Sequence, residues 1–159
     1  MKVLTDFSAI EPTALGPLLL SELSFQQQKT NLPHMLQTMD HHFREARNAA
    51  STAGPPHQML IILGDGRGAL NDGLENVQKA IARLNRAEVT TLYIVMDNGK
   101  QSIVDVRVVE FQANASEPKI IPYMGRFPFP FYAVVRGVGA LPSTMSEAIR
   151  QWFELIASD

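Results

Sequence analysis

The sequence MLIILGDGRG, residues 59–68, joins an uninterrupted apolar run to a polar turn that is rich in glycine. An apolar run without polar alternation is typical of a strand that is covered on both faces of a sheet. The runs TLYIVM at residues 91–96 and FYAVVR at residues 131–136 have the same character. These three runs predict buried strands of a parallel sheet.

Stretches with helical periodicity alternate with these strands. Apolar residues recur at helical spacing in residues 33–50, 72–86 and 145–156, which predicts three helices that each bury one face. A further strand is predicted at residues 1–6 and a weaker one at residues 103–111. The alternation predicts one α/β domain over the whole chain, with a mostly parallel sheet, right-handed crossovers and helices on both faces.

Two of the predicted helices have starts that are visible in the sequence. Asp72 precedes Glu75 by three positions, and Thr144 precedes Glu147 by the same spacing. This is the spacing of a capping box, in which two side chains bind free backbone N–H groups at the start of a helix. Pro142 also fits a boundary just ahead of the last helix. We therefore expect these helices to begin after Asp72 and Thr144.

The composition excludes several classes of function. The chain has 159 residues and no cysteine, which excludes disulfides, thiol catalysis and iron–sulfur clusters. Fourteen Lys and Arg residues against sixteen Asp and Glu residues give a net charge of -2. Neither half of the chain is basic enough to predict a surface for nucleic acid or membranes. No apolar run approaches the roughly 18 residues that a membrane span needs, so the sequence predicts a soluble intracellular domain.

Ligands of open α/β sheets bind beyond the carboxyl ends of the strands, which here are the loops after the first two predicted strands. One hypothesis for this edge is a dinucleotide site, because Gly64, Gly66 and Ala69 fit the glycine fingerprint. It predicts a small nucleotide-binding enzyme that uses the loop 64–69. Asp65 argues against this hypothesis because its charge would repel a pyrophosphate, and Asn-Asp-Gly at residues 71–73 delays the next helix.

A second hypothesis is a divalent-cation site in which Asp65 supplies a hard oxygen ligand. Mg²⁺ needs several oxygen ligands, and Thr30 is a candidate because it lies just ahead of the helix that starts near Pro33. The interpretation without a ligand is that Asp65 caps its own turn. The spacing alone leaves these alternatives open.

Other conspicuous residues have a structural interpretation beside a functional one. The adjacent His41 and His42 diverge by about 100° on a helix, which favours a surface position over a shared metal. The run FPFPF at residues 127–131 is expected to anchor the following strand, in preference to acting as a polyproline-like docking segment. Trp152 is expected in the core, and Arg67 is expected either to meet an acidic partner or to be solvated.

Six blocks of the sequence carry a resemblance to a known family. They are FQQQKT (25–30), DGRG (65–68), SIVD (102–105), YMGRFPFPFY (123–132), ALP (140–142) and RQWFEL (150–155). Together they resemble the C-terminal von Willebrand A-type domain of the midasin family, dynein-like AAA ATPases of large ribosomal subunit assembly. The resemblance covers nearly the whole chain, and FPFPFY and RQWFEL are specific to midasins among A-type domains.

The resemblance implies a Rossmann-like fold with a metal-ion-dependent adhesion site. In that family the Mg²⁺ ligands are a DxSxS motif, a threonine that matches Thr30 and an aspartate that matches Asp65. The DxSxS motif has no counterpart in this sequence, so we expect a partial domain that lacks the first strand and helix, and an incomplete ligand set. Gly64 stands where the family commonly has serine.

The resemblance also implies a non-catalytic interaction domain. A carboxylate of a ubiquitin-like domain from a pre-ribosomal assembly factor would complete the metal coordination, with Lys29, Gly66, Arg67 and Gly68 beside the contact. The sequence has no Walker motif and thus no ATP site. The AAA ring of a parent protein would pull on the bound factor, and the expected compartment is the nucleus.

Overall fold

A computed structural model describes residues 16–18, 20–21, 31–50, 56–97, 99, 101–111 and 117–158 of the chain. The strand predicted at residues 1–6 and the site residues Lys29 and Thr30 lie outside the described residues. The described elements are α2 (Leu32–Ala49), β1 (Gln58–Gly64), α3 (Gly68–Asn71), α4 (Leu74–Arg86), β2 (Val89–Asp97), η1 (Ile103–Asp105), β3 (Arg107–Glu110), β4 (Lys119–Pro122), η2 (Tyr123–Arg126), β5 (Phe131–Arg136), η3 (Val138–Ala140) and α5 (Leu141–Ala157), where η denotes a 3₁₀ helix.

A parallel sheet with the strand order β1-β2-β5 forms the centre of the described structure. Its strands coincide with the three apolar runs of the sequence, each within two residues at either end. β2 lies between the other two strands and is the most buried of them. The predicted α/β class and parallel pairing are confirmed, and the arrangement is compatible with a Rossmann-like domain.

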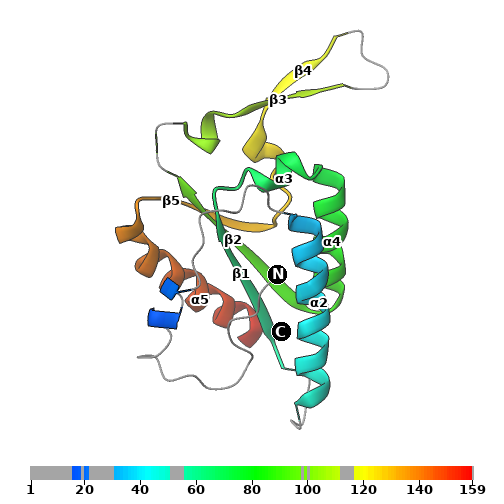
Figure 1. Ribbon diagram of the computed structural model, residues 1–159, viewed down its shortest axis with the longest axis vertical. Helices are drawn as coiled ribbons and strands as arrows, with labels where there is room; N and C mark the ends of the chain where they lie inside the picture. The colour runs from blue at the N-terminus through cyan, green and yellow to red at the C-terminus, as the bar shows by residue number, and fades with distance from the viewer. Residues whose placement is uncertain are drawn as a thin grey trace.

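Helices cover both faces of this sheet, as predicted (Figure 1). On one face α2 and α4 lie side by side, and they contribute Leu36 and Leu84 to the main core. On the other face lies α5, whose Met145 packs against a smaller cluster around Ile94. No residue of α5 is fully buried, so this layer is the more open one. Among the described helices, none combines the length and the apolarity that crossing a membrane requires.

β5 is less buried than its sequence predicts. Val135 is its one fully buried residue, while Phe131 and Tyr132 are 47% and 44% exposed. The reason is position: β5 pairs with β2 on one side, and none of the described strands pairs with its other side. An apolar run identifies a strand but cannot distinguish the centre of a sheet from its flank.

The expected cap of α4 caps α2 instead. α4 begins at Leu74, and its cap position is held by Gly73, which has no side chain to offer. Asp72 Oδ2 accepts a hydrogen bond of 2.6 Å from the backbone N–H of Leu32, the first residue of α2. A carboxylate satisfies a free N–H group at any helix start within its reach, so the spacing could not tell which helix Asp72 serves.

The capping box predicted at Thr144 is also wrong. α5 begins three residues earlier, at Leu141, and Thr144 Oγ1 donates a hydrogen bond of 2.9 Å to the carbonyl of Ala140. Glu147 binds Arg150, at 3.0 Å between Oε2 and Nε, and not the helix start. Pro142 lies inside the first turn, where its missing N–H group would have no partner anyway.

A two-stranded antiparallel ribbon, β3–β4, projects from the domain (Figure 1). The strand predicted at residues 103–111 begins as the 3₁₀ helix η1 and becomes β3 at Arg107. β4 was not predicted, because its sequence KIIP offers two apolar residues between a lysine and a proline. An ion pair between Arg126 and Glu110 ties η2 to the ribbon.

An aromatic cluster joins the central strand to the segment ahead of β5. Phe127 contacts Tyr93, Tyr123, Phe129 and Tyr132, with ring centroids 5.4, 5.8, 5.5 and 5.2 Å away. Phe129 and Tyr123 are among the most buried side chains of the described part. The anchoring role predicted for the FPFPF run is therefore confirmed.

The two adjacent histidines lie at the surface, as predicted. Both are beside the carboxylate of Glu45, at 3.2 Å for His41 Nε2 and 3.6 Å for His42 Nδ1. They share this one carboxylate.

We expect Tyr123→Phe to lower the free energy of unfolding by about 1–3 kcal/mol, because a buried carbonyl would lose its hydrogen-bond donor. Tyr123 is fully buried, and its hydroxyl donates a hydrogen bond of 2.9 Å to the carbonyl of Gly66. Urea denaturation measures the difference. Tyr132→Phe is the matched control, because this tyrosine of the same cluster is 44% exposed. The control should change stability by less than about 0.5 kcal/mol, and equal losses in both variants would contradict the prediction.

Candidate functional site

The carboxyl ends of β1 and β2 meet at one edge of the sheet, where sequence reasoning placed the site. Gly64 pairs with Val95 there, so the loops after the two strands lie next to each other. A hollow of about 140 Å³ lies between these loops. It is lined by Asp65, Arg67, Met96, Asp97, Gln101 and Ile103.

Asp65 closes its own turn and remains exposed. Its Oδ1 accepts a hydrogen bond of 2.9 Å from the backbone N–H of Arg67. The interpretation of Asp65 as a turn residue is therefore confirmed. Exposure leaves the side chain open to a ligand as well, so the two interpretations of Asp65 do not exclude each other.

Gly66 connects this turn to the core through close packing and a hydrogen bond. Its φ of +75° favours glycine, and a Cβ atom here would lie 2.6 Å from Ile103 Cδ1. Its carbonyl accepts the hydrogen bond from Tyr123, and Gly66 itself is buried. The buried interior of the domain thus determines where the neighbouring Asp65 lies.

Gly64 is required by its neighbour on β2. A Cβ atom on Gly64 would lie 2.4 Å from Tyr93 Oη, which is far closer than two such atoms can approach. Burial raises the pKa of the Tyr93 hydroxyl, which therefore stays protonated at neutral pH. This packing gives a physical reason for glycine at position 64.

Arg67 connects the two loops of the site. It precedes α3, and its Nη2 donates to the carbonyl of Gln101 in the loop after β2. The side chain is half-buried and half open to solvent, so both interpretations of Arg67, a solvated charge or a contact to an acidic partner, stay predictions. Gly68, which starts α3, is also half-buried beside it.

Asp97 is the last residue of β2, but its side chain is buried and already hydrogen-bonded. Its Oδ2 accepts a hydrogen bond of 2.5 Å from Ser102 Oγ, and its Oδ1 accepts one of 3.2 Å from the N–H of Gly99. The Ser102 bond is the main cause that lowers the pKa of the Asp97 carboxyl; Arg136 and Arg67 contribute as nearby positive charges. The sequence places the segment 97–99 at this edge but does not predict a ligand role for Asp97, although its position at the end of a strand was a usable signal.

The described residues supply one free carboxylate for a cation at this edge. They contain no group of three or more His, Asp or Glu side chains that could hold a metal ion. Both carboxylate oxygens of Asp97 already accept hydrogen bonds, so Asp65 is the better candidate ligand. The predicted contribution of Thr30 stays a prediction, because Thr30 lies outside the described residues.

The geometry does not favour a dinucleotide at the loop 64–69. The glycines lead into α3, which has four residues, and the longer helix α4 begins only at Leu74. A pyrophosphate site of this type relies on the N-terminus of a full helix directly after the glycines. The exposed carboxylate of Asp65 lies in the same turn and would oppose the charge of a phosphate.

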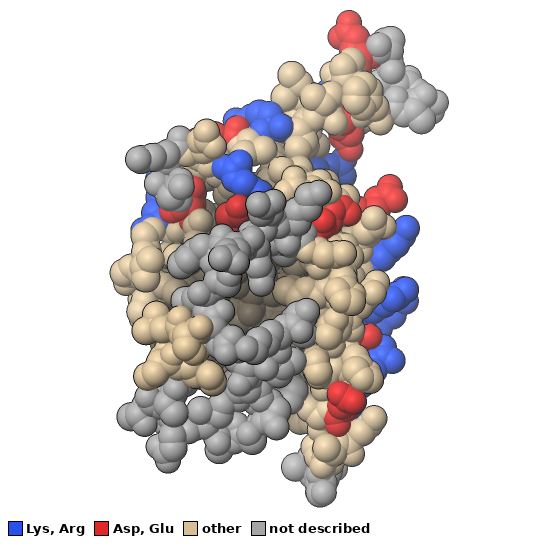
Figure 2. Space-filling view, in the orientation of Figure 1, with Lys and Arg blue, Asp and Glu red and all other residues tan. Residues whose placement is uncertain are grey.

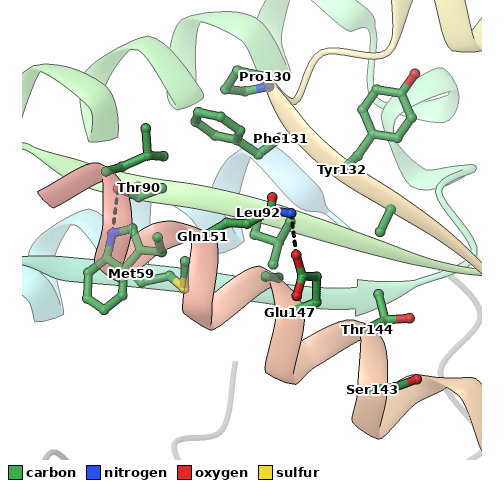
Figure 3. A pocket seen from close by; sticks show the side chains of 14 residues that line it. Met59, Thr90, Leu92, Pro130, Phe131, Tyr132, Ser143, Thr144, Glu147 and Gln151 are labelled. Carbon is green, nitrogen blue, oxygen red and sulfur yellow. Dashed lines mark hydrogen bonds between the residues drawn. The ribbon is translucent and has the colours of Figure 1, made fainter. Parts of the chain in front are cut away.

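A larger groove lies between α5 and the sheet (Figure 3). Its volume is about 560 Å³, and its walls include Leu92, Phe131 and Trp152. Trp152 is half-buried here, and its Nε1 donates a hydrogen bond of 3.1 Å to Thr90 Oγ1. It therefore lines a groove and is not the core residue that its sequence predicts.

The acid of this groove is engaged with its own helix. Glu147 accepts hydrogen bonds from Arg150 and from Gln151, the latter at 2.8 Å (Figure 3), and these bonds lower the pKa of Glu147 to about 2. The groove therefore offers an ionised, already bound carboxylate and mainly apolar walls. Among the described residues that line the groove, Glu147 is the one carboxylate.

We expect Gly64→Ala to destabilise the domain by about 1–3 kcal/mol, because the added methyl group overpacks the site against Tyr93. In a Tyr93→Phe background the same substitution should cost markedly less, since the hydroxyl that it meets is gone. A double-mutant cycle measured by urea denaturation gives the coupling between the two positions, which should reach about 0.5–3 kcal/mol. Additive effects would show that Tyr93 Oη is not the reason for glycine at position 64.

We also expect stability to depend on pH through Asp97. The pKa of the Asp97 carboxyl in the folded state lies below its ordinary value of 3.8. The contribution of Asp97 to the free energy of unfolding is therefore complete above pH 3.8, and it is lost as the pH falls through the lower, folded-state pKa. Asp97→Asn should be less stable than the parent at about pH 7, and the difference should shrink below about pH 4. Thermal denaturation across this range tests the prediction. Ser102→Ala should show a smaller deficit of the same sign, and a deficit in Asp97→Asn that does not vary with pH would contradict the prediction.

Comparison with known proteins identifies relatives of the chain, although no protein-family model matches it. The sequence is 29% identical to the midasin of Dictyostelium discoideum over 164 aligned residues, which cover 99% of this chain and 3% of that protein. It is 31% identical to the midasin of Giardia intestinalis over 104 residues, which cover 63% of this chain and 2% of that protein. The chain thus spans a very small part of the length of these relatives. The resemblance to midasin drawn from the six sequence blocks is confirmed: the chain is similar to one short segment of midasin along nearly its whole length.

Proposed function

We propose that this chain is a protein-interaction module of a midasin-type factor in the assembly of the large ribosomal subunit. The observation that carries the proposal is the similarity to midasin along 99% of the chain. The module acts in the nucleus by binding a protein partner and not by catalysis. The hollow at Asp65, at about 140 Å³, is smaller than the roughly 300 Å³ of ordinary small-molecule sites, so at this edge a contact with a protein side chain fits better than a small-molecule substrate.

Asp65 would hold a Mg²⁺ ion that a carboxylate of the partner also binds. Two features support this role: the side chain is exposed, and its turn is fixed by hydrogen bonds at Arg67 and Gly66. Mg²⁺ prefers oxygen ligands in an octahedral arrangement and usually keeps several waters. With a single protein carboxylate and a neutral hydroxyl such as that of Thr30, the bound ion would retain positive charge. It would therefore attract an acidic side chain.

The proposed partner is a ubiquitin-like domain of a pre-ribosomal assembly factor. Arg67 and Gly68 would lie at the edge of the contact, and Lys29 would join them from the segment ahead of α2. Gly66 is buried and would contribute by shaping the turn, without touching the partner. In a parent protein that carries the AAA ring, pulling on the bound domain would release the assembly factor from the particle.

Titration calorimetry of a purified ubiquitin-like domain of an assembly factor against this chain tests the proposal. We expect binding in Mg²⁺ that EDTA abolishes. Asp65→Asn should also abolish binding, because the amide keeps an acceptor for the Arg67 N–H group but removes the charge that holds the ion. The Asn variant should remain folded, so its loss of binding would not reflect unfolding.

The matched control is Asp105→Asn, which removes an exposed acid of η1. It should bind the ubiquitin-like domain like the parent chain. Binding that survives both EDTA and Asp65→Asn would contradict the metal bridge while leaving the partner in place. The absence of binding in every condition would contradict the choice of partner.

A further inference from the structure

A hollow lined by arginines lies where α2 and α4 end. Its volume is about 720 Å³, and Arg44, Arg47, Arg83 and Arg86 line it together with Asp40. In Figure 2, Lys and Arg side chains gather along the edge of the molecule where α2 and α4 lie. Neither the hollow at Asp65 nor the groove along α5 is lined by as many arginines.

The hollow is remote from the proposed metal site. Arg47 contacts Gln58, the first residue of β1, and Ala87, which lies just ahead of β2. Asp65 and Asp97, in contrast, lie where these two strands end. The hollow therefore belongs to the opposite end of the sheet, and a ligand bound there would not depend on the metal contact proposed at Asp65.

Arg47 forms a fixed wall of the hollow. Its Nη2 donates a hydrogen bond of 2.8 Å to Gln58 Oε1 and another to the carbonyl of Ala87. Gln58 is held in turn, because its Nε2 donates to the carbonyl of Phe43 at 3.0 Å. Within the described residues no carboxylate pairs with Arg47, and its buried Nε has no acceptor. A half-buried cation without a counter-charge is costly, so an anion in the hollow would stabilise it.

Positive charge exceeds negative charge among the lining residues. The single carboxylate is that of Asp40, and it pairs with Arg44 at 3.0 Å. Arg83 and Arg86 are exposed, and neither forms an ion pair in the part of the chain that the structure describes. Both lie in the last turn of α4, where the free carbonyl groups of the helix favour cations. Their charges are therefore held near the hollow without being neutralised.

The lining favours carboxylates over nucleic acid. It contains no aromatic side chain on which a base could stack. The chain carries a net charge of -2, and Asp40 interrupts the positive surface along which a phosphate backbone would run. Guanidinium groups bind carboxylates through two parallel hydrogen bonds, and neighbouring guanidiniums suit neighbouring acidic side chains.

We propose that this hollow binds an acidic segment of a partner protein, in which adjacent Asp or Glu side chains pair with Arg83 and Arg86 beside the fixed Arg47. The domain then has two separate protein contacts, one at each end of its sheet. The acidic segment binds without a metal ion, in contrast to the contact proposed at Asp65.

Fluorescence polarisation of a labelled peptide of about ten glutamates, titrated with the full chain, tests the inference. We expect saturable binding at about 50 mM NaCl that weakens at least about tenfold at about 300 mM, because exposed ion pairs are screened. Arg83→Glu/Arg86→Glu should weaken binding at least about tenfold, since two attractions become repulsions. Arg47 is left unchanged because its hydrogen bonds hold α2 to the sheet.

The matched control is Arg107→Glu/Lys119→Glu, which changes the net charge equally but on the exposed faces of the β3–β4 ribbon. This variant, EDTA and Asp65→Asn should all leave peptide binding unchanged, and circular dichroism should show that each variant is folded. An equal loss of affinity in the control would mean that net charge alone drives binding, which overturns the inference. So would the absence of binding at low salt. Tighter binding of an oligouridine of the same length, lost in Arg83→Glu/Arg86→Glu, would assign the hollow to nucleic acid instead.

Discussion

The hydrogen bond from Tyr123 to the carbonyl of Gly66 is the contact on which the arrangement of the sheet edge at Asp65 depends. It joins residues 57 positions apart and fixes the turn after β1 to the aromatic cluster around Phe127. Burial raises the pKa of the Tyr123 hydroxyl, so the group stays protonated and keeps donating at any physiological pH. The exposed carboxylate of Asp65 is thus positioned from inside the core, and its place does not depend on the loop alone.

Two aspartates end neighbouring strands of the same sheet, yet they have different roles. Asp65 is exposed and engages one oxygen with its own turn, whereas Asp97 is 7% exposed and engages both oxygens with the loop after β2. The difference comes from Ser102, which lies close enough to donate directly to Asp97. One carboxylate is therefore available to a ligand, while the other holds the neighbouring loop in place.

The features that the sequence predicts correctly are those in which a local pattern is enough. The three apolar runs became the three parallel strands, and the periodic stretches at residues 33–50 and 72–86 became α2 and α4. The features that it misses depend on distant partners. The carboxylate of Asp72 caps a helix forty positions away. The hydroxyl of Tyr93 on β2 leaves no room for a side chain at Gly64 on β1. In the site, Asp65 was predictable from its place after a strand, but the burial of Asp97 and the bond from Arg67 to Gln101 result from tertiary packing.

The helices α2 and α4, on one face of the sheet, are linked by a hydrogen bond at each end. Asp72, just ahead of α4, holds the first N–H group of α2, and Arg47 in the last turn of α2 holds the carbonyl of Ala87, just after α4. Each of these bonds joins residues forty positions apart. A force that pulls on the chain ahead of α2 would therefore load the two helices in shear. Both hydrogen bonds would have to break before either helix could separate from the other. The domain thus gains mechanical resistance from two hydrogen bonds without a larger core.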